Sequence, residues 1–254
     1  MNIAEQVRQL KTDFDEVKNA GYEVGMDAFW NQIQPEGNES YKTGSGYFNG
    51  RIFCDNNFYP KRDIVPVGDA SYLFYGWEKK KQLVVMNLKQ RLIDCGVRLD
   101  TSKATNLSWM FGYSAYINNI PTIDFTGLTT QASNVFAHTW AGCSIIEKLI
   151  VTESTTYSTW FLNATGLTTI SFADADGNTE NVIGQSIDFQ YSTQLSKESI
   201  KKIVKALSGN ASGKTLTLTR TAVINAFGST TADEWTALIA PKIAPNGGWT
   251  ITLV

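Results

Sequence analysis

The feature that most constrains this chain is a phenylalanine that returns every 25 residues. Phe111, Phe136 and Phe161 stand at equal intervals, and each is followed by a polar turn and a short apolar segment. A fixed period of this length is typical of solenoids, because one repeat cannot bury its own apolar face and depends on its neighbours. The sequence therefore predicts a core that runs without interruption through several stacked repeats.

The apolar segments share one spacing, with apolar residues at the first, fourth and sixth positions. This spacing predicts short strands whose inward side chains stack on those of the next repeat. The positions are Ile120, Ile123 and Phe125; Ile146, Leu149 and Val151; and Leu167, Ile170 and Phe172. Weaker copies flank them at 71–77, which resembles 108–114, and at 96–100 and 186–190. Residues 83–95, closed by Gly96, predict a strand and a helix that lengthen the first repeat.

The first residues carry a different pattern, an apolar seam with the spacing of a coiled coil. The seam consists of Ile3, Val7, Leu10, Phe14 and Val17. We expect 1–34 to be a helical oligomerisation segment that forms a homotrimer, since the seam has no polar residue to enforce a dimer and Phe14 suits a wider core. Packing of the seam on its own domain is the alternative. Residues 35–69 are expected to be an irregular connector, and 70–254 the solenoid.

Near the carboxyl end, Gly213, Lys214 and Thr215 stand in the order of a phosphate-binding loop. That motif needs four residues between its first glycine and the Gly-Lys pair, and it runs from a strand into a helix. Here Gly209 and Gly213 enclose only three residues, and the predicted order is helix, then strand. Nucleotide binding is therefore not expected, and we interpret the glycines as a left-handed helix ending.

Two helix-turn-strand units are expected to cap the solenoid at this end. In the first, Ser196 caps a helix that reaches residue 207, and Leu216 and Leu218 alternate with threonines in a strand. In the second, Thr231 and Glu234 form a predicted capping box. That helix has Trp235, Leu238 and Ile239 on its apolar face, ends at Pro241, and is followed by a strand with Trp249, Ile251 and Leu253.

Composition excludes several classes of function. A net charge of -2, with scattered Lys and Arg, offers no surface for nucleic acid. No apolar run approaches the roughly 18 residues of a membrane span, and the amino terminus lacks the pattern of a secretory signal. Cys54, Cys95 and Cys143 lie far apart, so we expect small buried side chains and neither disulfides nor metal ligands.

Catalytic and metal-binding patterns are weak. His138 is the only histidine, no nucleophile motif lies near it, and a solvent-facing repeat residue is the better interpretation. Residues 173–180 contain four oxygen-bearing side chains, Asp174, Asp176, Asn178 and Glu180, but lack the spacing of a calcium loop. We expect a polar turn there, no cofactor or metal, and no enzymatic activity.

Aromatic residues near the recurring phenylalanines form the remaining functional signal. Rings on one face of a solenoid would line up into a platform for a sugar or protein partner. The candidate ligand contacts are Trp109, Tyr113, Tyr116, Trp140, Tyr157 and Trp160. The phenylalanines themselves are expected to be buried.

Residues 141–151 (AGCSIIEKLIV) resemble the repeat of BspA-like leucine-rich-repeat proteins, and 163–172 (NATGLTTISF) form a looser copy. The closing helix-turn-strand region resembles the terminal units of such proteins encoded by phages and prophages of gut bacteria. The resemblance implies a right-handed α/β repeat solenoid, leucine-rich-repeat-like with short parallel strands. It implies a protein used for structure or adhesion, commonly without catalysis. We expect a non-catalytic virion or prophage structural protein, assembled in the bacterial cytoplasm.

Such a protein would serve as a tail fibre, receptor-binding or decoration protein. Its expected partners are copies of itself, other virion proteins and a bacterial surface glycan or protein. A bacterial surface adhesion module and a polysaccharide-degrading tail enzyme are the alternatives.

Overall fold

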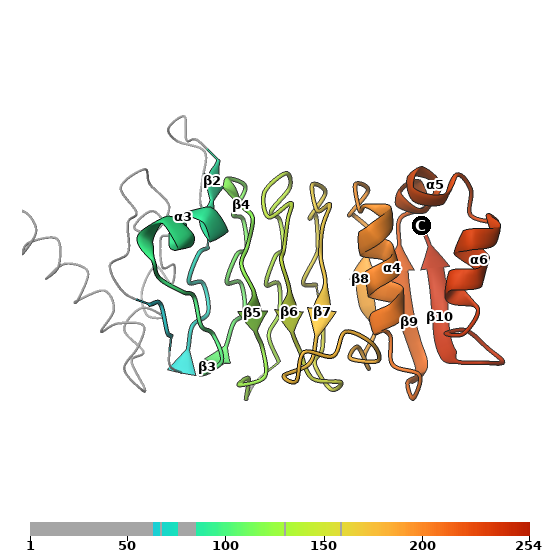
Figure 1. The fold of residues 1–254 in the computed structure, drawn as a ribbon, viewed down its shortest axis with the longest axis horizontal. Helices are drawn as coiled ribbons and strands as arrows, with labels where there is room; N and C mark the ends of the chain where they lie inside the picture. Colours follow the sequence, from blue (N-terminus) through green and yellow to red (C-terminus); the bar gives the residue numbers. More distant parts are fainter. Residues whose placement is uncertain (1–62, 67, 76–84, 130, 158) are drawn as a thin grey trace, which may run out of the picture.

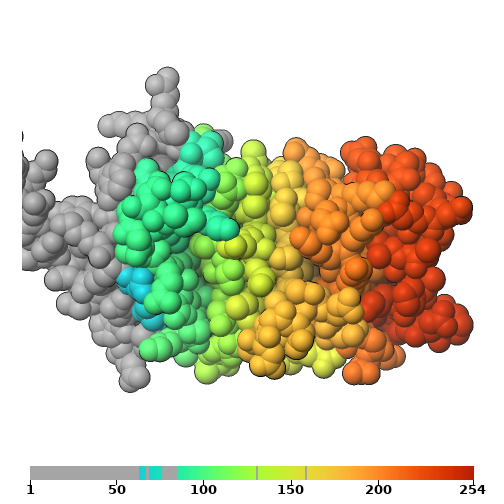
Figure 2. Space-filling view, viewed as in Figure 1, coloured from blue at the N-terminus to red at the C-terminus, as the bar shows by residue number. Residues whose placement is uncertain are grey.

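The computed structural model describes residues 63–66, 68–75, 85–129, 131–157 and 159–254. Through these residues the chain forms successive coils that lie side by side along the long axis (Figure 1). Every strand pair in them is parallel. The space-filling view shows the coils following one another in sequence order (Figure 2). The predicted seam from Ile3 to Val17 and most of the predicted connector lie outside the described residues.

The first described coils form two small sheets. β1 (Gly68–Asp69) pairs with β3 (Ala104–Asn106), and β2 (Met86–Asn87) pairs with β4 (Ile117–Asn118). Ile64 is buried and forms a parallel bridge with Leu99, so the stack begins before residue 70, within the stretch assigned to the connector. As expected, a strand leads into helix α3 (Leu88–Cys95), which ends at the left-handed Gly96.

The middle coils contribute a three-stranded sheet made of β5 (Ile123–Asp124), β6 (Leu149–Ile150) and β7 (Phe172–Ala173). All nine inward positions expected from the sequence are at most 2% exposed. Backbone hydrogen bonds continue between the coils beyond the strands: the amide of Phe111 donates to the carbonyl of Val135, and that of Phe136 to the carbonyl of Trp160. Each coil therefore depends on the next for its hydrogen bonds as well as for its core.

A column of stacked phenylalanine rings runs through these coils, and we call it the phenylalanine column. It consists of Phe74, Phe111, Phe136, Phe161 and Phe189, all at most 1% exposed. Successive ring centroids are 5.0, 5.4, 5.6 and 4.6 Å apart, with interplanar angles of 25° or less. The weaker copies at 71–77 and 186–190 thus contribute rings to the same column.

Close contact between coils requires glycine at position 142. A Cβ on Gly142 would lie 2.2 Å from the carbonyl oxygen of Ser114 in the preceding coil. Ser114 is itself buried, and its hydroxyl donates to the carbonyl oxygen of Phe74. The backbones of neighbouring coils therefore approach as closely as their main-chain atoms allow.

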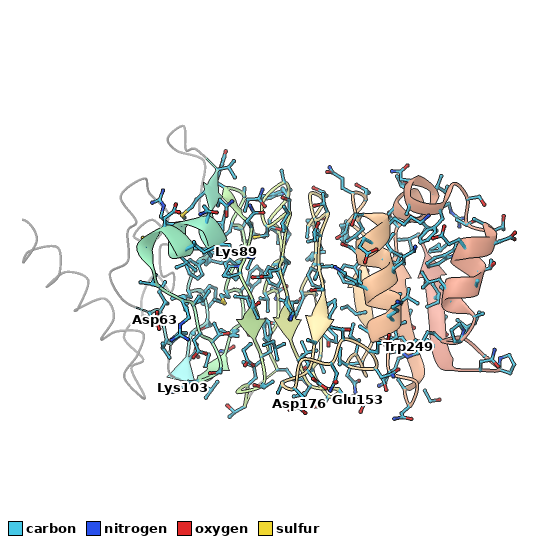
Figure 3. All side chains as sticks on the ribbon, in the orientation of Figure 1. Asp63, Lys89, Lys103, Glu153, Asp176 and Trp249 are labelled. Carbon is cyan, nitrogen blue, oxygen red and sulfur yellow. The ribbon has the colours of Figure 1, made fainter. Side chains whose placement is uncertain are left out.

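The last part of the chain has longer elements. β8 (Ile187–Phe189), β9 (Ser212–Leu218) and β10 (Gly248–Leu253) form a parallel sheet. Helices α4 (Lys197–Ala206), α5 (Arg220–Phe227) and α6 (Asp233–Ile239) lie in the same part of the molecule (Figure 1). Side-chain sticks fill the spaces between the elements, from Asp63 in the first described coil to Trp249 in β10 (Figure 3).

The end of α4 differs from the prediction. Ser196 caps its start as expected, with its hydroxyl accepting from the backbone N–H of Ser199. At the other end, however, Leu207 is extended, and the left-handed Gly213 lies inside β9. The predicted left-handed glycine ending is therefore wrong. The ammonium of Lys242 donates to the carbonyls of Lys205 and Leu207, so a distant side chain satisfies these groups.

The predicted capping box of α6 is also wrong. Its N-cap residue is Ala232, which makes no side-chain cap. Glu234 instead reaches α4, where it pairs with Lys197 at 2.5 Å and Lys201 at 2.7 Å. These hydrogen bonds lower the pKa of the Glu234 carboxyl. Helix α5, which Thr219 caps, was not predicted as a separate element because its start coincides with the end of the alternating strand pattern.

Candidate recognition surface

Six rings from three successive coils gather beside the phenylalanine column, and we call this group the aromatic patch. Its members are Tyr72, Tyr75, Trp109, Tyr113, His138 and Trp140. Each ring belongs to a residue within four positions of the column phenylalanine of its coil. The repeat that aligns the buried column therefore also aligns the patch.

The rings of the patch contact one another across the coils. Tyr72 and Trp109 are stacked at 6.4 Å, and Trp109 and Tyr113 at 5.9 Å. Tyr113 stacks on His138 at 4.7 Å and meets Trp140 edge to face at 5.7 Å. Trp140 is 41% exposed, while the other five are partly buried. The six rings therefore form a continuous aromatic group in which the partly buried rings pack against one another and Trp140 is accessible to solvent.

The backbone beneath the patch is left-handed, a conformation that favours Asn and Gly over bulky residues. At the position two residues after the column phenylalanine, φ is 61° for Tyr113, 56° for His138 and 56° for Asn163. At the position two residues before it, φ is 65° for Tyr72, 60° for Trp109, 55° for Asn134 and 58° for Thr159. The fold thus accepts asparagine at both positions and threonine at one, whereas four of these sites hold an aromatic ring at a conformational cost.

Two neighbours hold the patch in place. A Cβ on Gly112 would lie 2.5 Å from Cε3 of Trp109, so the missing side chain leaves room for the indole to lie against the backbone. The side-chain amide nitrogen of Asn163 is 3.1 Å from Nδ1 of His138, within hydrogen-bond distance. The tryptophan and histidine rings are therefore fixed by their own coil and by the next one.

The six ligand contacts predicted from the sequence differ in their location in the structure. Trp109, Tyr113 and Trp140 lie together in the patch, while Tyr116 packs, partly buried, against the hydrophobic core. Tyr157 and Trp160 are 3% and 0% exposed, so assigning them to a surface platform was wrong.

The reason for the error is the place of Trp160 within its coil. It directly precedes a column phenylalanine, a position where Met110 and Val135 are also fully buried in other coils. Its indole N–H is satisfied inside the molecule by the carbonyl of Ala132 at 2.7 Å. Tyr157 packs edge to face on Trp160 at 5.1 Å, and burial raises the pKa of its hydroxyl.

Three members of the patch were missed from the sequence. The similarity of 71–77 to 108–114 places Tyr72 at the position of Trp109, and this signal could have found it. Tyr75 has no such counterpart, because Gly112 holds the matching position. His138 was expected to face solvent, but it lies partly buried against Tyr113.

The other candidate sites have structural roles. The carboxylate of Asp174 accepts hydrogen bonds from the backbone N–H groups of Asp176 and Asn178, which makes the expected polar turn. Among the described residues, no group of three or more His, Cys, Asp or Glu side chains is arranged to hold a metal ion. Cys143 is buried, which raises the pKa of its thiol, while Cys95 is only partly buried and Cys54 lies outside the described residues.

Comparison with known proteins returned no match among family models, curated proteins or solved structures. In the part of the chain that the structure describes, no helix combines the length and apolar character required to cross a bilayer.

Proposed function

We propose that the protein is a non-catalytic recognition protein of a phage virion, of the tail-fibre, receptor-binding or decoration type. Its coils would form a leucine-rich-repeat-like α/β solenoid that presents the aromatic patch to a bacterial surface glycan or protein. The observation that carries the proposal is that aromatic rings from three successive coils stack beside the phenylalanine column, several of them at left-handed backbone positions that other coils fill with asparagine or threonine. Left-handed backbone is unfavourable for an aromatic residue, and such strained positions are common at functional sites, so these rings are candidates for a functional role.

The geometry of the patch suits a sugar better than it suits an ion. Aromatic faces offer apolar area together with polar edges, which matches the mixed apolar and hydroxylated faces of a saccharide ring. The stacked rings span three coils, so an extended chain of sugars could contact several of them at once. Trp140, the most exposed ring, would be the main contact.

The virion assignment is supported by the resemblance of the closing helix-turn-strand region to the terminal units of BspA-like leucine-rich-repeat proteins encoded by phages and prophages. Oligomerisation through the seam from Ile3 to Val17 would place several patches on one particle. Linked copies bind through avidity, which converts a weak contact at each patch into firm attachment. Under this proposal the chain needs other virion proteins as partners but no cofactor.

Binding of the labelled full-length protein to bacterial cells and to their extracted surface polysaccharides tests the proposal. Trp140→Ala should weaken binding at least tenfold, as expected for a central aromatic contact, and should leave the melting temperature nearly unchanged. Ile224→Ala is the matched control, because Ile224 is 42% exposed but lies on α5, outside the patch.

Two outcomes would contradict the proposal. If wild type and Trp140→Ala bind cells and polysaccharides equally well, the aromatic patch does not contribute to recognition. Release of reducing sugar from the polysaccharide by the wild-type protein would favour the polysaccharide-degrading alternative. Binding by the patch together with a bacterial surface location of the native protein would favour the adhesion module.

A further inference from the structure

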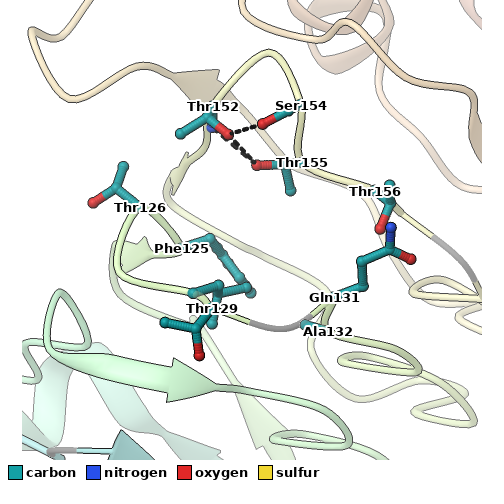
Figure 4. Close-up of a pocket in the computed structure, with 10 residues that line it drawn as sticks. Phe125, Thr126, Thr129, Gln131, Ala132, Thr152, Ser154, Thr155 and Thr156 are labelled. Carbon is teal, nitrogen blue, oxygen red and sulfur yellow. Dashed lines mark hydrogen bonds between the residues drawn. The ribbon is translucent and has the colours of Figure 1, made fainter.

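A pocket lies between two neighbouring loops, one following β5 and the other following β6 (Figure 4). Its volume is about 190 Å³. The loop after β6 includes Glu153, which is labelled at the lower edge of the stack in Figure 3. None of the residues that line the pocket belongs to the aromatic patch.

The lining is rich in hydroxyl groups and carries no charge. Seven of its ten residues have a hydroxyl or amide side chain, and the other three are apolar: Phe125, Leu128 and Ala132. The polar set consists of Thr126, Thr129, Gln131, Thr152, Ser154, Thr155 and Thr156. Without a cationic side chain the pocket offers little to a phosphate, and without a carboxylate it offers little to a metal ion.

The loop after β6 is held in shape by its own side chains. The hydroxyl of Thr152 lies 3.0 Å from that of Ser154 and 3.1 Å from that of Thr155 (Figure 4). The backbone N–H of Thr152 also donates to the Thr155 hydroxyl at 2.9 Å. Each hydroxyl has one donor and two acceptor sites, so these groups keep hydrogen-bonding capacity for a ligand.

One polar atom in the pocket lacks a partner. Oγ1 of Thr156 is buried and makes no hydrogen bond within the described part of the chain. Gln131 reaches toward Thr156 from the opposite loop (Figure 4). A buried hydroxyl without a partner is destabilising. Because this oxygen lies below the accessible surface, a ligand hydroxyl could satisfy it only after neighbouring side chains of the two loops move aside.

We propose that this pocket binds one neutral sugar residue. A saccharide ring supplies several hydroxyl groups for the polar wall and an apolar face for Phe125 and Leu128. The volume is smaller than the roughly 300–1,000 Å³ of sites for drug-sized ligands, which limits the occupant to about one ring. The proposal does not depend on the aromatic patch, and it places a second, separate sugar site at the ends of β5 and β6.

Saturation-transfer NMR on the full-length protein tests this site with methyl hexopyranosides, N-acetylglucosamine and, as a charged probe, glucuronate. We expect transfer to at least one neutral sugar, with glucuronate at least tenfold weaker. Thr156→Val keeps the side-chain shape, and it should abolish the transfer while raising the melting temperature. Gln131→Ala provides a second variant at an exposed residue, where folding is not at risk.

These measurements are made in the Trp140→Ala background, which removes the main contact of the aromatic patch, so the remaining transfer reports the pocket. Ile224→Ala, outside both sites, is the control and should leave that transfer unchanged. Transfer to no neutral sugar, or undiminished transfer in both pocket variants, would overturn the proposal. Transfer in the wild-type protein but none in Trp140→Ala would assign the sugar to the aromatic patch and leave the pocket without a ligand. Failure of cell binding with retained transfer would count against the recognition function only.

Discussion

The phenylalanine column and the aromatic patch run through the same coils, yet they differ in nearly every physical respect. The column rings are buried and stacked nearly parallel, while the patch mixes stacked and edge-to-face contacts and reaches solvent at Trp140. Trp109 and Tyr113 each lie only two positions from Phe111 in the sequence. The repeat period aligns both groups, and the offset from the phenylalanine decides which group stabilises the fold and which is available for binding.

The difference also shows in the backbone. Phe111 and Phe136 are not among the residues with positive φ, whereas Trp109, Tyr113 and His138 are. Column residues therefore contribute packing without this conformational cost, while every patch residue except Tyr75 has a left-handed backbone that is unfavourable for its side chain. Substitutions in the column should change stability, and substitutions in the patch should change binding.

The largest effect is expected from Phe136→Ala, which removes a fully buried ring from the middle of the column. The cavity and the lost transfer free energy should lower the free energy of unfolding by about 3 to 5 kcal/mol, measured by denaturant titration. Phe136→Leu retains most of the volume and should cost under about 1.5 kcal/mol. A similar small cost for both variants would contradict the column as the main source of stability.

A pair of glycine substitutions compares the two regions directly. Gly142→Ala would place a methyl group 2.2 Å from the backbone oxygen of Ser114, and it should cost about 1 to 3 kcal/mol or more because main-chain atoms cannot move aside. Gly112→Ala meets the ring of Trp109 instead. It should change the tryptophan fluorescence and weaken ligand binding, with a smaller loss of stability. Equal destabilisation by the two variants would refute this distinction.

His138→Asn should change stability by less than about 1 kcal/mol, because asparagine suits the left-handed backbone that Asn163 adopts in the next coil. Removing the ring from its stack with Tyr113 should nevertheless weaken binding to cells or polysaccharide. Thermal unfolding and a binding titration on the same preparation measure both effects. A large loss of stability with unchanged binding would show that His138, like the phenylalanine column, stabilises the fold and does not contact a ligand.

The smallest expected effect is on the pH dependence of stability. The phenylalanine column contains no titratable group, so this dependence must come from titratable groups elsewhere in the molecule. The pKa of Glu234 is lowered by its hydrogen bonds to Lys197 and Lys201, so its contribution to stability is present above its unfolded pKa and is lost as pH falls through the folded one. Glu234→Gln should remove this part of the acid dependence without moving the rest of the unfolding curve. An unchanged pH profile in the variant would show that the pairs contribute nothing measurable.

By itself, the sequence determined the period, the nine inward positions and the burial of the column. It also determined the start of α4 at Ser196, where the cap is an interaction within one turn. These features depend on residues close together in sequence or repeated at equal intervals, so their pattern is visible in one dimension.

Only the tertiary structure decided which aromatic residues reach the surface and how the final helices end. Trp160 is buried and Trp140 exposed although both are tryptophans near a column phenylalanine, because the direction of each side chain depends on its place in the coil. Lys242 satisfies the end of α4, and Glu234 pairs with α4 in place of a capping box. These contacts join segments more than 30 residues apart, and no local pattern records which distant group will meet a helix end.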